Sequence, residues 1–310
     1  MPTVTDLILP DKSDFGVAVE GSVAAWPGTK EKPALPPFDS LNRQRSYIEV
    51  FARGNKPIQF KAVADRNWII LTEGKAPGAG QDRRIWVNID WNKAPAGRAR
   101  GTITISGSGR PVTVKLTAIK ATAEQAREAQ GCFGGLTGPI SILAADATAN
   151  IPVGDMRWEK LPDYGRGQAA MEIFPVTAGT IQPPNPAPRL EYPVYFARAG
   201  KYDVELITSP TLDVIPTRGL GVAVSVDDQP PQVVNVFTPD TYKNEDFLGR
   251  AFYDNTRNND RDMLFKQTVG APGKHTLKIT MLDPTVVIMK IVIRDLPLPP
   301  SYFGPPERFD

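Results

Sequence analysis

Short β-patterned runs, repeatedly interrupted by glycine and proline, constrain the fold of this chain more than any other feature. The 310 residues include 31 Pro and 26 Gly, which suit tight turns and interrupt helices. Between the turns, β-branched and aromatic residues alternate with polar ones, as in "SYIEVFAR" and "PVTVKLTA". This alternation is typical of half-buried strands, so the sequence predicts an all-β chain. Its length suffices for two domains.

The first predicted domain covers residues 1–120. Six short alternating runs lie between residues 45 and 118, and clusters of Gly, Pro, Asn and Ser separate them. Such regular spacing predicts a small immunoglobulin-like β-sandwich. The Pro-rich residues 1–44 are weakly patterned apart from "GVAVEGS". We expect this N-terminal segment to wrap around the sandwich.

A predicted helix and a glycine-rich linker, residues 121–138, divide the chain. "ATAEQAREAQ" is the most convincing helical stretch, because Thr122 and Gln125 fit a capping box and Gly131 suits the position after the helix end. The next segment, "GCFGGLTG", has four glycines. Residues 139–310 return to the β pattern with at least eight candidate strands, one of them "DFLGRAFYD", and predict a jelly-roll sandwich.

Composition excludes several classes of function. The net charge is +2 without a Lys/Arg run, so the sequence gives little support for nucleic-acid binding. The longest apolar runs are too short to cross a bilayer. The N-terminus has no signal-peptide pattern, so we expect either a cytoplasmic protein or a piece of a longer secreted one. The single Cys132 excludes an intramolecular disulfide and a cysteine-based zinc site.

The single histidine has two interpretations, as do the paired aspartates. Catalysis by a Ser-His-Asp or Cys-His arrangement would need His275, but in "GKHTLKITM" this residue shares a strand face with apolar side chains. The pattern favours a half-buried packing residue. Asp227 and Asp228 precede "QPP", where aspartate forms turns, and a turn is favoured over an acid/base pair.

Many short motifs, in a shared order, resemble one known enzyme family. In the first half they are "GVAVEGS", "AWPG", "LPPFD", "YIEVFARGNKPIQF" and "RRIWVNIDWNKAPAG". In the second half they are "WEKLPDYGRG", "LEYPVYF", "SPTLDV", "AVSVDDQPPQVV", "YDNTRN", "GKHTLKITMLDPTVVIMKIVI" and "SYFGPPE". Together they resemble the accessory β-sandwich and the C-terminal domain of glycoside hydrolase family 115, the xylan α-glucuronidases. The second domain also resembles the jelly-roll carbohydrate-binding modules of families 6 and 35.

The resemblance implies partners and a location. The family's catalytic barrel has no counterpart in the strand pattern of these 310 residues, so we expect no catalytic residue and no enzyme activity in this chain. Expected partners are the catalytic domain of a parent enzyme, plant cell-wall glucuronoxylan and a second copy of the chain in a homodimer. The parent protein is expected to be secreted or periplasmic. The chain is also expected to need no cofactor other than a structural calcium ion.

The resemblance also directs attention to two segments that lead toward the sugar-binding loops of such modules. Aromatic rings stack on the C–H face of a sugar, and planar polar groups bind its hydroxyls or a uronate carboxylate. The candidates of this kind are Trp158, Tyr164, Arg166, Tyr253, Asn255 and Arg257. The alternative for Trp158 and Tyr164 is packing at the sandwich edge.

Calcium and a second aromatic surface complete the candidate sites. The related modules hold calcium through an early acidic segment, but here Leu143 and Ala145 stand where its carboxylates would be. Only Asp146 remains nearby. In "YDNTRNNDRD" the aspartates 254, 260 and 262 could gather around an ion, although a solvated loop is favoured. In "RRIWVNIDW", Trp86 is expected on the polar face, where it could meet a glycan or another protein domain, or be covered by the N-terminal segment.

Three hypotheses follow for the function. The first is a non-catalytic module pair that binds glucuronoxylan-type polysaccharide through an aromatic and polar surface. The second is a structural or dimerisation module without sugar binding of its own. The third, a hydrolase that uses carboxylates of the second sandwich, is the least favoured.

Overall fold

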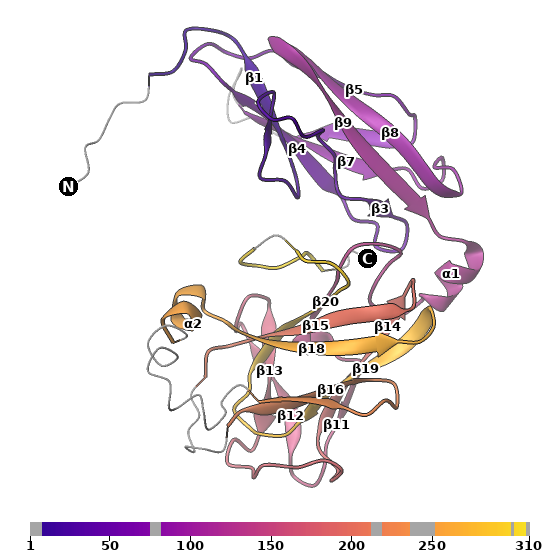
Figure 1. The fold of residues 1–310 in the computed structure, drawn as a ribbon, viewed down its shortest axis with the longest axis vertical. Coiled ribbons are helices and arrows are strands. Elements are labelled where there is room, and N and C mark those ends of the chain that lie inside the picture. Colours follow the sequence, from indigo (N-terminus) through magenta and orange to yellow (C-terminus); the bar gives the residue numbers. More distant parts are fainter. Residues whose placement is uncertain (1–7, 75–81, 212–218, 236–251, 299–300, 308–310) are drawn as a thin grey trace, which may run out of the picture. The chain divides into compact units, whose positions relative to one another are not determined.

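The computed structural model describes residues 8–74, 82–211, 219–235, 252–298 and 301–307, with the side chains of 252–254 excepted. Nearly all regular structure in these residues is β-strand, and the chain divides into two compact units after Ala123. The predicted all-β fold with two sandwiches is therefore confirmed (Figure 1). Among the described helices, none has the length and hydropathy needed to cross a membrane.

The first unit is a sandwich of two sheets. One sheet has the order β2 (Ala25–Trp26), β1 (Phe15–Val19), β4 (Ser46–Ala52), β7 (Arg83–Ile89), β6 (Ile69–Glu73). The other has the order β3 (Phe38–Asp39), β9 (Gly109–Lys120), β8 (Gly97–Gly107), β5 (Phe60–Ala64). Neighbouring strands are antiparallel apart from the parallel pair β3–β9. Ile48 and Ile85 lie opposite each other and are fully buried, as their alternation with polar residues requires.

The N-terminal segment does more than wrap the first sandwich, so that expectation was wrong for residues 15–19. Strand β1 lies between β2 and β4 in the sheet. Its residues Phe15, Val17 and Val19 are at most 3% exposed. Their period of two places one face of β1 in the core, where a segment that only wrapped the sandwich would not lie.

The helix α1 (Ala123–Glu128) forms within the predicted stretch and is shorter than expected. Gly131, three residues after its end, has a φ of 70°. A side chain is strained in this left-handed conformation, which explains a glycine there.

The second unit is also a two-sheet sandwich (Figure 1). Its larger sheet has the order β12 (Arg157–Pro162), β13 (Ala169–Phe174), β20 (Ile288–Arg294), β15 (Gly200–Thr208), β18 (Arg261–Val269), and β10 (Ile140–Leu143) also pairs with β20. Its second sheet has the order β11 (Ala149–Ile151), β14 (Arg189–Phe196), β19 (Gly273–Met281), β16 (Gly221–Val226), β17 (Gln232–Asn235). Apolar side chains from both sheets fill the core between them.

A helix replaces part of one predicted strand. In "DFLGRAFYD" we expected a strand, but the structure has α2 (Phe252–Asn258) at its C-terminal end, and residues 246–251 lie outside the described part. The sequence "FYDNTRN" is rich in Asn, Asp and Thr, and Asn and Asp are depleted in strands. Only the two aromatic residues at its start indicated a strand.

The C-terminal tail, residues 301–307, lies on the outer face of the larger sheet. Nζ of Lys290 on β20 donates to the carbonyl oxygens of Phe303 (2.8 Å) and Pro305 (2.7 Å) and forms an ion pair with Glu307 (2.6 Å). The hydroxyl of Ser141 also donates to the Pro305 carbonyl at 2.9 Å. The tail is thus fixed mainly through its backbone, and it forms one wall of the site described next.

Candidate functional site

A pocket of about 490 Å³ lies on the outer face of the larger sheet of the second unit. Its floor comes from β15, β18 and β20, and its walls from the β12–β13 loop, the segment after α2 and the C-terminal tail. We call it the Arg166 pocket. It is lined by Arg166, Glu205, Ile207, Asn258, Asp260, Asp262, Val292, Arg294, Leu298, Ser301, Tyr302, Gly304 and Pro305.

The β12–β13 loop places Arg166 in the pocket wall. Gly165 has a φ of 82°, and a Cβ there would lie 2.5 Å from Sδ of Met289, so both the conformation and the space favour glycine. The Arg166 guanidinium donates to the carbonyl of Asn258 at 2.7 Å and forms an ion pair with Asp260. Its Cζ lies 4.3 Å from the ring centroid of Tyr302. The Arg166 side chain is only 5% exposed.

The remaining charges of the pocket are arranged on the sheet itself. Arg294 and Glu205 form an ion pair at 3.3 Å. Asp262 is on the outward-facing row of β18 and makes no ion pair with any described residue. Burial in the pocket, followed by the nearby carboxylates of Asp260 and Glu205, raises the pKa of Asp262 to about 6, against the opposing effect of Arg166 and Arg294. As far as the described residues go, the pocket therefore contains one carboxylate, that of Asp262, without an ion-pair partner.

The raised pKa predicts a pH-dependent gain in stability from Asp262→Asn. The folded state holds the Asp262 proton up to about pH 6, whereas the unfolded state releases it near the ordinary aspartate pKa of 3.8. Wild-type stability should therefore decrease between about pH 4 and pH 6, and the asparagine variant should lack this decrease. At pH 7 the variant should be more stable by on the order of 1 kcal/mol, a reduced value because the carboxylate is partly solvated.

Urea denaturation of the wild type and the variant at pH 4 and pH 7 measures this difference. Asp203→Asn is the matched control, because Asp203 is on the same sheet face but pairs with Lys266 at 2.6 Å. That variant should show no gain at pH 7. An equal gain in both variants would mean that general charge removal, and not the pocket, causes the effect.

The structure brings together some of the predicted site residues. Arg166 and Asp260, from segments far apart in the sequence, meet in one ion pair. Tyr164, two residues before Arg166 in the chain, is 41% exposed and does not line the pocket, and its hydroxyl bonds to that of Ser209 at 2.8 Å. Asn255 and Arg257 are on α2 and do not line the pocket. The side chains of Tyr253 and Asp254 lie outside the described part of the chain.

Trp158 was wrongly predicted as a sugar-binding residue. Its side chain is 2% exposed, and its indole N–H donates to the carbonyl of Pro188 at 3.3 Å. The ring faces the core of the second unit. A sugar cannot reach it, so the packing alternative holds for Trp158.

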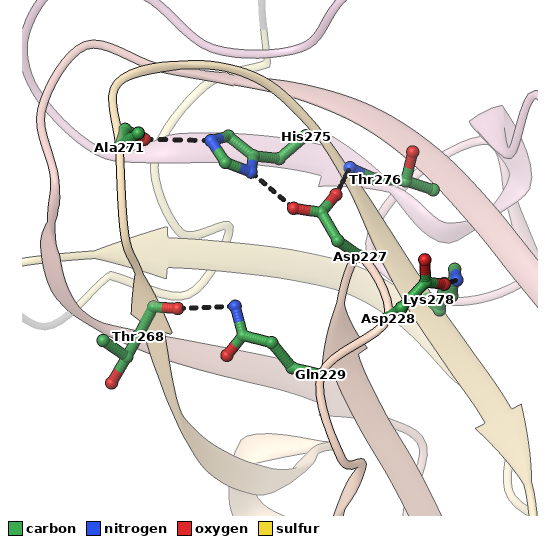
Figure 2. Close-up of polar contacts among 8 residues, drawn as sticks. All are labelled: Asp227, Asp228, Gln229, Thr268, Ala271, His275, Thr276 and Lys278. Carbon is green, nitrogen blue, oxygen red and sulfur yellow. Dashed lines mark hydrogen bonds and ion pairs between the residues drawn. The ribbon is translucent and has the colours of Figure 1, made fainter.

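His275 is a structural residue that joins two turns of the second unit, and Figure 2 shows its contacts. Its Nδ1 lies 2.6 Å from the Asp227 carboxylate and its Nε2 lies 2.9 Å from the carbonyl oxygen of Ala271. Both partners are hydrogen-bond acceptors, so both bonds form only when each ring nitrogen carries a proton. The second oxygen of Asp227 accepts the Thr276 backbone N–H at 2.8 Å.

The two aspartates of the β16–β17 turn bind different residues of the same strand, β19. Asp227 binds His275 and Thr276, whereas the fully exposed Asp228 pairs with Lys278 at 2.8 Å. They do not face a common point, so the predicted turn is confirmed.

A second hollow, of about 570 Å³, lies beside His275, and no aromatic side chain other than the imidazole lines it among the described residues. The Arg166 pocket is therefore the better candidate for a sugar.

Comparison with known families decides the identity of the second unit. The family model described as the glycosyl hydrolase family 115 C-terminal domain matches residues 133–307, which is more than half of the chain. The chain belongs to this family. The resemblance inferred from the scattered motifs of the second domain is thereby confirmed, and the Arg166 pocket lies within the matched residues.

Solved structures with a similar fold include a family 115 enzyme and two carbohydrate-binding modules. The enzyme is a 4-O-methyl-α-glucuronidase with specificity for decorated arabinogalactans (TM-score 0.38, 17% identity, 51% of this chain and 17% of that chain covered). One module is a family 35 carbohydrate-binding module from Clostridium thermocellum (TM-score 0.33, 10% identity, 52% of this chain and 100% of that chain covered). The other is the C-terminal family 6 module of a laminarinase from Zobellia galactanivorans (TM-score 0.33, 18% identity, 51% of this chain and 100% of that chain covered). The chain spans less than a fifth of the family 115 enzyme. No curated protein sequence matches it.

Outside the family 115 C-terminal domain, Trp86 of the first unit lies in a cluster of aromatic and cationic side chains. Its ring packs edge-on against Tyr47 with centroids 5.7 Å apart, and the Arg45 guanidinium lies 4.1 Å from the ring centroid. Arg84 lies at the same distance from the Tyr47 ring. Tyr47 and Arg45 thus cover part of the Trp86 ring. The sequence predicted either a ligand surface or coverage by the N-terminal segment, and neither prediction included these two contacts.

The candidate calcium ligands of the family 115 C-terminal domain form no metal site among the described residues, although Asp260 and Asp262 line the same pocket. Asp260 is paired with Arg166, and Asp146 is in the short 3₁₀ helix η1 (Ala144–Asp146) after β10. Burial raises the pKa of Asp146, which Lys160 opposes. Among the described residues, no three His, Cys, Asp or Glu side chains come together in a way that could hold a metal ion. A structural calcium ion stays a prediction.

Among the charged and aromatic residues of the Arg166 pocket, sequence reasoning missed three: Glu205, Arg294 and Tyr302. Glu205 and Arg294 are outward-facing residues of predicted strands, and their sequence neighbourhood does not distinguish them from other surface charges. Tyr302 is in "SYFGPPE", which was noted only as a family-like ending. The adjacent aromatic residues Tyr302 and Phe303, in an otherwise polar and Pro-rich tail, were the feature that could have pointed to a binding surface there.

Proposed function

We propose that this chain is a non-catalytic carbohydrate-binding part of a family 115 xylan α-glucuronidase and that it binds glucuronoxylan-type polysaccharide through the Arg166 pocket. The observation that carries the proposal is a half-exposed aromatic ring beside hydrogen-bonding charges. Tyr302 is 51% exposed, and Arg166, Asp260 and Asp262 line the same pocket. A pyranose offers an apolar C–H face to a ring and hydroxyls to such groups.

The proposal includes partners and a location. The chain is a small fraction of the family 115 enzyme it was compared with, so the natural partner is the catalytic domain of a parent enzyme. A polymeric substrate meets its enzyme outside the cell, so we place the parent enzyme in a secreted or periplasmic location. The role of this chain would be to keep the polymer close to the catalytic domain.

Affinity electrophoresis tests this function directly. The purified chain should be retarded by glucuronoxylan and by arabinoxylan, and not by a mannan control. Decorated arabinogalactan is the fourth polymer, and stronger retardation by it than by the xylans would contradict the proposed specificity. Incubation with glucuronoxylan should release no 4-O-methylglucuronic acid. No retardation by any polymer, together with a dimer in solution, would favour the structural alternative.

The variant Tyr302→Ala should weaken binding to glucuronoxylan by about three- to tenfold, since one aromatic contact contributes roughly 0.5–1.5 kcal/mol beyond area burial. Leu296→Ala is the control, because Leu296 is 69% exposed and does not line the pocket. Phe303 is unsuitable as a control, because its ring packs edge-on against that of Tyr302 with the centroids 5.0 Å apart. Isothermal titration calorimetry measures both affinities, and equal losses would place the ligand elsewhere.

A further inference from the structure

We infer that the Arg166 pocket binds an uncharged sugar ring, such as a xylose unit of the polysaccharide backbone, and not the glucuronate side group. This inference rests on the proposed carbohydrate binding and specifies which part of an acidic xylan enters the pocket. Four features of the pocket support it: its paired guanidinium groups, the sealed edge of Arg166, the unpaired carboxylate and the apolar floor.

Both guanidinium groups of the pocket are already neutralised by protein carboxylates. Arg166 pairs with Asp260, and Arg294 pairs with Glu205 at 3.3 Å. A uronate would have to displace one of these carboxylates in order to form an ion pair. The Arg166–Asp260 pair is protected from exchange, since the two side chains are 5% and 14% exposed.

The edge of Arg166 that would grip a uronate is closed. A carboxylate binds a guanidinium most strongly through two parallel N–H bonds, for example from Nε and one terminal nitrogen. Nε of Arg166 is buried and has no acceptor among the described residues. The terminal nitrogen Nη2 is bonded to the Asn258 carbonyl and to Asp260. The bonds of Nη2 hold the guanidinium in place, and the burial of Nε keeps an incoming anion away from the Nε–Nη2 edge.

Within the described part of the chain, the one pocket charge without an ion-pair partner is negative, that of Asp262. Asp262, Asp260 and Glu205 carry three negative charges against the two positive charges of Arg166 and Arg294, so the pocket has a net charge of −1 when Asp262 is ionised. Like charges at close range in a partly desolvated site repel each other strongly. A second carboxylate is therefore disfavoured, whereas a neutral hydroxyl can donate a hydrogen bond to Asp262.

The floor of the pocket suits the apolar face of a pyranose. Ile207 and Val292 close the bottom of the pocket and are themselves only 6% and 2% exposed. The apolar surface that a ring could touch comes from Leu298, which packs against them and is partly buried, and from Tyr302, which is 51% exposed. A xylose ring has no charged substituent and could place its C–H face on this surface with its hydroxyls toward Asp262.

Calorimetry with three soluble ligands tests the inference: xylohexaose, a xylo-oligosaccharide carrying one 4-O-methylglucuronate, and the same oligosaccharide with its carboxyl group reduced to an alcohol. We expect xylohexaose and the reduced ligand to bind with dissociation constants within about threefold of each other. We also expect the acidic ligand to bind no more tightly than the reduced one. An acidic ligand that binds about tenfold more tightly than its reduced form would overturn the inference while leaving the proposed function intact.

The variant Asp262→Asn gives an independent readout. It should weaken xylohexaose binding by about fivefold, because a charged acceptor is lost, and it should improve the acidic ligand relative to the reduced one. Asp203→Asn removes the same charge from the same sheet face outside the pocket and should change neither affinity. Identical behaviour of the two variants would contradict the placement of the sugar. No binding of any of the three ligands by the wild type would overturn the proposed function and this inference together.

Discussion

Replacing Arg166 with methionine should lower the free energy of unfolding of the second unit by about 3–5 kcal/mol. Methionine retains much of the side-chain volume but leaves the Asp260 carboxylate without its cationic partner. Asp260 is 14% exposed, and an uncompensated buried charge is strongly destabilising. The variant also loses the bond to the Asn258 carbonyl and the stacking on Tyr302. Urea denaturation followed by circular dichroism measures the loss.

Two further variants identify the cause of that loss. Arg198→Met removes an arginine from an ion pair with Asp295 at 3.0 Å, whose side chains are 69% and 36% exposed, and should cost less than about 1 kcal/mol. Adding Asp260→Asn to Arg166→Met should restore part of the stability, since the unpaired charge is then gone. If Arg166→Met costs no more than Arg198→Met, the Arg166–Asp260 pair does not stabilise the unit.

The second large effect concerns Asp227, whose replacement with alanine should cost about 2–4 kcal/mol. Its carboxylate binds the His275 ring at 2.6 Å and the Thr276 backbone N–H at 2.8 Å, and bonds to charged groups contribute about 1.5–3 kcal/mol each. Asp227 also has a φ of 54°, which aspartate tolerates better than alanine. Thermal and urea unfolding measure the change.

The neighbouring aspartate provides the control. Asp228 is fully exposed and pairs only with Lys278 among the described residues, so Asp228→Ala should leave the free energy of unfolding unchanged within the error of the measurement. Asp227→Asn tolerates the positive φ and can still accept the Thr276 N–H, but its amide cannot replace the carboxylate at His275. It should fall between the wild type and the alanine variant, at about 1–2 kcal/mol. Equal costs for the two alanine variants would show that the contacts drawn in Figure 2 contribute little.

The sequence predicted the parts of the fold that depend on local alternation. Strands such as β4 and β7 repeat an apolar residue at every second position, and both were expected within a residue or two of their observed bounds. Strand β1 was missed as part of the sheet because it is a single short run within a Pro-rich segment. The pairing of β1 with β2 and β4 is a long-range property that its own residues do not encode.

The Arg166 pocket was only partly predictable for the same reason. Arg166 and Asp260 were both singled out from their own segments, but nothing local indicated that they form a pair. Glu205 and Arg294 are adjacent only through the pairing of β15 with β20. Trp158 shows the opposite error: its motif resembled a binding loop, whereas the inward-facing position on β12 puts the ring in the core.

The way the tail is fastened has a consequence for how ligand preference could evolve in such domains. Lys290 and Ser141 donate hydrogen bonds to the backbone carbonyl oxygens of residues 303 and 305. Any amino acid at these two positions would supply the same carbonyl oxygen. Side chains at 301 and 302 can therefore be exchanged without loosening the anchor. Substitutions at these two tail positions could therefore adapt the pocket to different glycans without any change in the underlying sandwich.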